Sequence, residues 1–128
     1  MEKLIMLIDD DSEELDIMNE ALGKGDIMAL CVWAQGCDHA LRLLKQVMPD
    51  YIFIDINMPI VNGLACLEEL KRDEKLAHIP MVMYSTYIND DTRKKAKEKG
   101  AICCMQKPDN VFTLVHQLTA FLKVKTAY

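Results

Sequence analysis

The sequence lacks the features that mark a disulfide framework or a structural zinc site. Its five cysteines are an odd number, they contain no CxxC pair, and no histidine stands at a metal-ligand spacing. We therefore expect the cysteines to be small apolar residues in a reducing compartment.

The sequence also lacks a long apolar run and an excess of positive charge. The apolar start, residues 4–8, is too short for a signal peptide or a membrane span and ends in three aspartates. The formal net charge of −5 disfavours nucleic acid as a direct partner, because phosphate backbones are bound by clustered Lys and Arg. We expect a cytoplasmic protein without membrane insertion or direct nucleic-acid binding.

Short apolar runs alternating with amphipathic segments make up most of the chain. Its 128 residues predict one domain over residues 1–128, with no effector domain beside it. The runs are nearly continuous, which is typical of strands buried on both faces of a parallel sheet. Helical spacing of apolar residues between the runs, as in Leu15, Met18 and Leu22, predicts an α/β fold with helices on both faces. The runs are residues 4–8, 27–33, 51–56, 79–84 and 101–105.

Polar residues follow four of the five runs. In folds of this kind, ligands bind outside the carboxyl ends of the strands. Converging carboxylates need a cation or a raised pKa, and Mg²⁺ prefers oxygen ligands. An ammonium group and a hydroxyl beside them would complete a phosphoryl site, with Asp55 as the nucleophile that forms an aspartyl phosphate. The residues, in chain order, are Asp9, Asp10, Asp11, Asp55, Asn57, Ser85, Thr86 and Lys107.

Each of these residues alone has an ordinary explanation. An aspartate after a strand is usually a helix cap, which we expect of Asp11, and a Lys-Pro pair is usually a surface turn. Only the ordered set, at four different strand ends, favours a phosphoryl site over a series of unrelated helix caps and turns.

The ordered set resembles the receiver domain of two-component response regulators, the family of the single-domain chemotaxis regulator. The similarity rests on Asp9-Asp10, on Asp55 in "IDINMP" with Gly63 eight residues later, on Ser85, and on Lys107 seven residues after Gly100. It implies a doubly wound (βα)5, flavodoxin-like three-layer sandwich with parallel strands in the order 2-1-3-4-5.

The resemblance also implies a role for each site residue. Asp55 would be the phosphoacceptor, with Ser85, Thr86 and Lys107 around the phosphoryl group, and Lys107-Pro108 would be a cis peptide bond. Mg²⁺ would be bound by the side chains of Asp10 and Asp55 and by the Asn57 carbonyl, with Asp9 contributing mostly through water.

The implied function is that of a signalling switch rather than a conventional enzyme. A sensor histidine kinase or a histidine phosphotransfer protein would donate a phosphoryl group to Asp55. The domain would catalyse its own phosphorylation and dephosphorylation. A surface of the fourth helix, fifth strand and fifth helix would then bind a downstream protein.

Two positions bear on how such a switch works. The family usually has Tyr or Phe where this chain has Cys104, so coupling through a swinging aromatic ring is not expected. Tyr87, two residues beyond Ser85, is bulky enough to hinder attacking water, which predicts slow loss of the phosphoryl group. A surface aromatic residue on a face that a partner covers is an equal alternative for Tyr87.

Three alternatives differ in the residues that they use. A haloacid dehalogenase-like phosphatase would use Asp9 as nucleophile and Asp11 as general acid, but it leaves Asp55 unexplained. A degenerate receiver would bind partners without phosphorylation. A flavodoxin-like cofactor binder is disfavoured because the acids after the first run would repel a cofactor phosphate.

Overall fold

Five parallel strands form a single sheet in the computed structural model, which describes residues 2–122. Their order is β2-β1-β3-β4-β5, as the resemblance implies, so the expected fold class is confirmed. Each strand begins and ends within two residues of its predicted run. The strands are β1 (Lys3–Ile8), β2 (Ala29–Ala34), β3 (Tyr51–Ile54), β4 (Met81–Ser85) and β5 (Cys103–Gln106).

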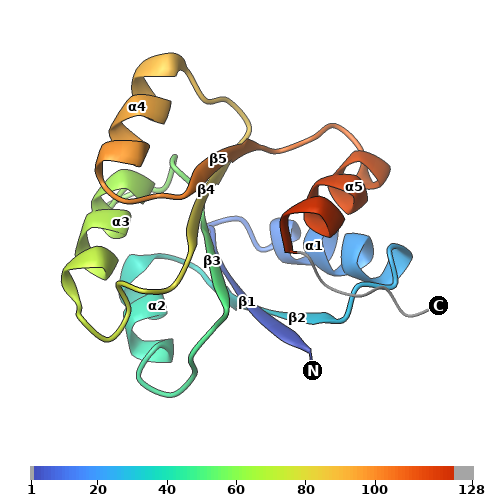
Figure 1. Ribbon diagram of the computed structural model, residues 1–128, viewed down its shortest axis with the longest axis horizontal. Helices are drawn as coiled ribbons and strands as arrows, with labels where there is room; N and C mark the ends of the chain where they lie inside the picture. The colour runs from blue at the N-terminus through green and yellow to red at the C-terminus, as the bar shows by residue number, and fades with distance from the viewer. Residues whose placement is uncertain (1, 123–128) are drawn as a thin grey trace.

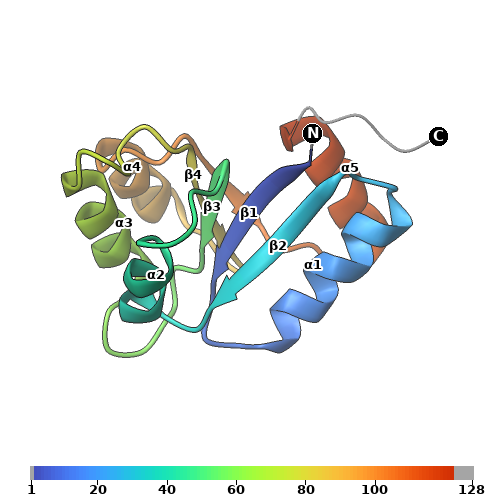
Figure 2. The ribbon, with the colours of Figure 1, turned by 90° about the horizontal axis from the view of Figure 1, so that it is seen from below.

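Helices cover both faces of the sheet and make three layers (Figure 1). On one face lie α2 (Cys37–Leu43), α3 (Gly63–Arg72) and α4 (Asp90–Glu98); on the other lie α1 (Glu13–Lys24) and α5 (Val111–Leu122). The same two groups of helices are separated by the sheet when the molecule is seen from below (Figure 2). No helix within residues 2–122 combines the length and the apolar content needed to cross a membrane.

Successive residues of the central strands pack into different layers. In β3, Ile52 and Ile54 belong to the cluster under α2, α3 and α4, whereas Phe53 between them packs toward α1 and α5. All three side chains have no exposed surface. Because strand residues alternate between faces and both faces are covered, the runs are continuously apolar.

The helix ends carry residues that commonly cap helices. The side-chain oxygens of Asn62, Asn89 and Asn110 accept hydrogen bonds from backbone N–H groups three residues later, as N-caps do. Gly100 ends the turn after α4 with a φ of 105°, in the left-handed region that glycine adopts freely. At α1 the carboxylate of Asp11 accepts from the N–H of Glu13.

Two expectations about the chain are wrong. Cys37 and Cys66, separated by 29 residues, form a disulfide between α2 and α3, with Cα atoms 5.6 Å apart. Both cysteines are buried in one apolar cluster, where packing of the two helices brings them together. In addition, the described residues contain no cis peptide bond, so Lys107-Pro108 is trans.

Candidate functional site

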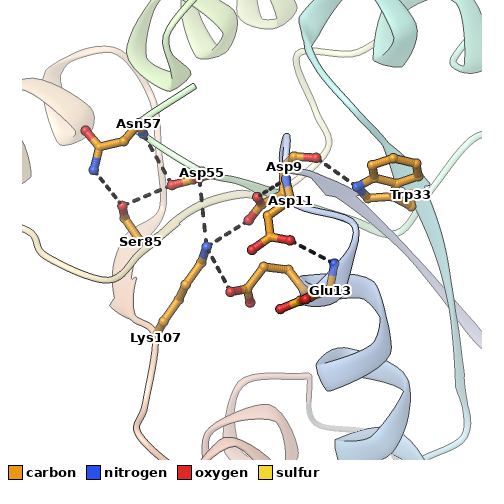
Figure 3. Close-up of polar contacts among 9 residues, drawn as sticks. Asp9, Asp11, Glu13, Trp33, Asp55, Asn57, Ser85 and Lys107 are labelled. Atoms are coloured by element: carbon orange, nitrogen blue, oxygen red, sulfur yellow. Dashed lines mark hydrogen bonds and ion pairs between the residues drawn. The ribbon is translucent and has the colours of Figure 1, made fainter. Parts of the chain in front are cut away.

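Most of the polar residues named from the sequence lie together at the carboxyl edge of the sheet, as Figure 3 shows for Asp9, Asp11, Asp55, Asn57, Ser85 and Lys107. Backbone hydrogen bonds hold the strand ends side by side: the N–H of Asp55 donates to Ile8 O at 2.9 Å, and the N–H of Lys107 donates to Ser85 O at 2.8 Å. The aspartates after β1 therefore lie beside Asp55 after β3, and Lys107 after β5 lies beside Ser85 at the end of β4. Asp9, Asp55 and Ser85 are the buried polar residues of the described chain.

The two carboxylate oxygens of Asp55 have different surroundings. Oδ1 accepts hydrogen bonds from the Ser85 hydroxyl at 3.0 Å and from the Asn57 N–H at 3.2 Å. Oδ2 lies 3.8 Å from Lys107 Nζ. The Asn57 amide also donates to Ser85 Oγ at 3.3 Å, which fixes the hydroxyl beside the carboxylate. Asp55 is only 6% exposed, so the protein holds its side chain in one orientation at the edge of the site.

Gly63 fixes the backbone beneath Asp55. A Cβ atom at this position would stand 2.1 Å from the Asp55 carbonyl oxygen, much closer than atoms approach without displacement. The Gly63 N–H donates to Ile56 O at 2.9 Å and closes the loop between β3 and α3. The glycine eight residues after Asp55 is thus required by close approach of two backbone segments.

Asp9 is fully buried and hydrogen-bonded on both carboxylate oxygens. Oδ2 accepts from Lys107 Nζ at 2.8 Å, and Oδ1 accepts from the Asp11 N–H at 3.0 Å. The Trp33 indole N–H donates to the Asp9 carbonyl at 2.8 Å and ties this loop to β2. Burial raises the pKa of Asp9 above its ordinary value, although the hydrogen bond from Lys107 opposes the shift.

Lys107 lies among three carboxylates. Its Nζ is 2.8 Å from Asp9, 3.5 Å from Glu14 and 3.8 Å from Asp55. Burial alone would lower the pKa of Lys107, but the hydrogen bond with Asp9 and the charges of the three acids together raise it. Sequence reasoning missed Glu14, because a glutamate in the first turn of a helix is ordinarily a surface residue that interacts with the helix dipole.

The acids of the site fit a divalent cation. Asp9, Asp10 and Asp55 each offer a carboxylate oxygen, and these atoms lie within 4.8 Å of one another. The ammonium group of Lys107 lies among Asp9, Glu14 and Asp55, and Asp10 is exposed beside them. The site therefore combines hard oxygen ligands with negative charge that a single lysine does not neutralise. This donor set suits Mg²⁺ or Mn²⁺ better than a soft metal.

Three other residues named from the sequence lie at the periphery. Thr86 is exposed and lines a cavity of about 380 Å³ together with Glu14, Tyr84 and Lys107. Tyr87 is 70% exposed. Cys104 is half-buried, and its carbonyl accepts a hydrogen bond from Arg93 at 3.3 Å.

Comparisons with known proteins agree on one family. Residues 5–119 match the family model of the response regulator receiver domain. The polar-differentiation response regulator DivK of Brucella ovis is 25% identical over 122 residues, covering 95% of this chain and 98% of DivK.

Solved structures of response regulators are similar over nearly the whole chain. The Mn²⁺-bound form of response regulator Rcp1 has a TM-score of 0.82 at 25% identity, covering 98% of this chain and 97% of the other. The phosphorylated cyanobacterial phytochrome response regulator RcpA has a TM-score of 0.83 at 27% identity, covering 96% and 93%. With its sheet order, its edge of polar residues and these similarities, the chain belongs to the response regulator receiver domain family of two-component signalling.

Proposed function

We propose that Asp55 accepts a phosphoryl group from a phosphohistidine and that this charge switches a protein-binding surface. The observation that carries the proposal is the convergence of an almost buried carboxylate, a hydroxyl and an ammonium group: Asp55, Ser85 and Lys107. Residues 1–128 would act as one receiver domain, which the single sheet of the described residues supports.

The proposed transfer uses the side chains at the sheet edge. A carboxylate oxygen of Asp55 forms a bond to phosphorus while the N–P bond of phosphohistidine breaks, and the released imidazole takes a proton from solvent. Lys107 and Ser85 would contact the phosphoryl oxygens, with Thr86 at the outer side, because catalysis of such a transfer consists of positioning and charge neutralisation. Dephosphorylation would follow by attack of water on phosphorus, which returns the Asp55 carboxylate and releases phosphate.

A divalent cation fits this chemistry. The side chains of Asp9, Asp10 and Asp55 would hold Mg²⁺ together with the Asn57 carbonyl, and the bound ion would neutralise negative charge on the phosphoryl oxygens. The fit rests on the three carboxylates within 4.8 Å.

The proposed partners are a sensor histidine kinase or a histidine phosphotransfer protein, and a downstream protein. The proposed exchange would take place in the cytoplasm. The downstream partner would bind the surface of α4, β5 and α5, since β5 is an edge strand and pairs with β4, the strand that carries Ser85. With Cys104 in β5, the change would reach this surface through the Ser85 loop rather than through an aromatic ring.

The test is intact mass after incubation with Mg²⁺ and acetyl phosphate as a small phosphodonor. We expect the wild type to gain one phosphoryl group. The gain should disappear in Asp55→Ala and after chelation of the metal, whereas Asp91→Ala, a matched aspartate change on exposed α4, should behave like the wild type.

Two other outcomes would redirect the assignment. A gain that persists in Asp55→Ala but disappears in Asp9→Ala would point to the phosphatase alternative, in which Asp9 is the nucleophile. No gain in the wild type, even with a phosphohistidine donor, would make the chain a phosphorylation-independent interaction module.

A further inference from the structure

Glu14 is a charged residue of the site that the transfer chemistry does not use. It stands in the first turn of α1, and its carboxylate lies 3.5 Å from Lys107 Nζ. The side chains of Glu14 and Lys107 are only 17% and 12% exposed, so this ion pair is shielded from solvent far more than an ordinary surface pair. Burial raises the pKa of Glu14, and Lys107 opposes that shift, which shows that the lysine is its compensating charge.

The position of the ammonium group is the second observation. Lys107 Nζ is nearer to Asp9 and Glu14, at 2.8 and 3.5 Å, than to Asp55 at 3.8 Å. The ring of Tyr84 flanks the same ammonium, with its centroid 5.6 Å away. In the structure, the Lys107 ammonium therefore lies toward the loop after β1 and the start of α1. In the proposed transfer, the same ammonium has to contact an oxygen of the phosphoryl group on Asp55.

From these contacts we propose that Glu14 is a positioning residue, which holds the Lys107 ammonium in the unphosphorylated site and competes with the phosphoryl group for it. The inference rests on the proposed function, because competition exists only if a phosphoryl group binds at Asp55. Glu14 thereby lowers the affinity of the site for a phosphoryl group and favours the resting state.

Replacement by glutamine isolates this role. Glu14→Gln keeps the shape of the side chain and removes its charge, so Lys107 loses one of its three carboxylate neighbours. A simple loss of negative charge also reduces repulsion of any anion nearby, and this general effect has to be separated from competition for Lys107. The matched control is Glu13→Gln, which removes the same charge from the neighbouring, exposed residue of α1.

The experiment measures binding of beryllofluoride, a phosphoryl analogue, at saturating Mg²⁺. Trp33, the single tryptophan of the chain, donates a hydrogen bond to the Asp9 carbonyl, so its fluorescence reports on the site. We expect Glu14→Gln to bind the analogue about fivefold more tightly than the wild type, the size expected for a shielded ion pair. Glu13→Gln should stay within about twofold of the wild type, because exposed charges are screened by solvent and salt.

A double-mutant cycle with Lys107→Ala tests whether Glu14 acts through the lysine. In the Lys107→Ala background, we expect the effect of Glu14→Gln to fall below about twofold, because the group for which it competes is gone. An equal gain in both backgrounds would overturn the proposal in favour of general repulsion, and unchanged or weaker binding by Glu14→Gln would overturn it directly. Circular dichroism of each variant confirms that it is folded.

The same titration distinguishes failure of the inference from failure of the proposed function. If the wild type does not bind beryllofluoride, or if Asp55→Ala binds it equally well, the proposed phosphoacceptor site is wrong. If the wild type binds it through Asp55 and Glu14→Gln binds no more tightly, only the role of Glu14 is wrong.

Discussion

The interior of the sheet and its carboxyl edge are a few residues apart on the same strands, yet they are built differently. Ile5, Leu7 and Ile8 of β1 have no exposed surface and belong to the two apolar clusters on either face of the sheet. Asp9, the next residue, is equally buried but has a raised pKa and a neighbouring ammonium group. The interior stabilises the fold by removing apolar surface from water, at about 25 cal/mol per Å². At the edge, carboxylates of like charge lie close together, and their repulsion lowers the free energy of unfolding.

Because of this difference, the free energy of unfolding and the ligand binding of the site can be changed separately. A substitution in the interior should lower the free energy of unfolding and leave the ligand preferences of the site intact. A substitution that removes a metal-binding carboxylate from the edge should raise the free energy of unfolding in the absence of metal and weaken metal binding.

Leu67→Ala should have the largest effect on stability. Leu67 lies in α3 with no exposed surface, and its truncation removes apolar contacts and leaves a cavity. We expect the free energy of unfolding to fall by about 3 kcal/mol, measured by urea denaturation. The folded variant should still take up one phosphoryl group from acetyl phosphate. A loss below about 1 kcal/mol would mean that this layer repacks, and that the interior is less rigid than its burial indicates.

Oxidation of Cys37 and Cys66 should have a similar or slightly smaller effect. The disulfide closes a loop of 29 residues between α2 and α3 and restricts the unfolded chain. Protein with the disulfide formed should be more stable than reduced protein by about 3 kcal/mol in urea denaturation. Cys66→Ser should remove the difference between oxidised and reduced samples. If alkylation without reduction modifies both cysteines in air-oxidised protein, the pair does not form in solution.

Asp10→Asn should have a smaller effect with the opposite sign. Asp10 is exposed beside Asp9 and Asp55, so neutralising it relieves repulsion among the three acids. Without divalent metal, we expect the free energy of unfolding to rise by about 0.5–1 kcal/mol. With Mg²⁺ the order should reverse, because only the wild type keeps the full set of ligands and gains binding energy. An Asp10→Asn protein that Mg²⁺ stabilises as much as the wild type would exclude Asp10 as a ligand.

The advantage of Asp10→Asn should depend on pH in a defined direction. The pKa of Asp9 is raised above 3.8 in the folded protein, so the folded state binds this proton more tightly than the unfolded chain does. The contribution of Asp9 to the free energy of unfolding is therefore fully present below pH 3.8 and is lost as the pH rises through the pKa of the folded state. Once Asp9 is protonated, Asp10 repels one charge fewer, and the difference between the variant and the wild type should shrink on acidification.

Much of the fold and the site could be predicted because the signals are local. Continuous apolar runs predict the strands, and the helical spacing of apolar residues between them predicts the helices. The polar residues after each run could be assigned to one edge because parallel strands share their carboxyl ends. The strand order came only from resemblance to receiver domains, since alternation of strands and helices does not determine it.

The rest depends on contacts between distant segments. Cys37 and Cys66 carry no local sign that α2 and α3 pack closely enough to join them. Glu14 looks like any glutamate at the start of a helix until α1 is placed against the loop after β5. The isomer of the Lys107-Pro108 bond is likewise set by surroundings, because both isomers of an X–Pro bond are close in energy.

The hydrogen bond from the Lys107 N–H to the Ser85 carbonyl has a consequence for communication between molecules. It links the end of β4, an inner strand, to the segment that follows β5, an edge strand of the sheet. A displacement of the backbone at Ser85 would therefore be transmitted to the edge of the sheet at β5. A partner protein that contacts this edge of the sheet could respond to the displacement without contacting the buried acids.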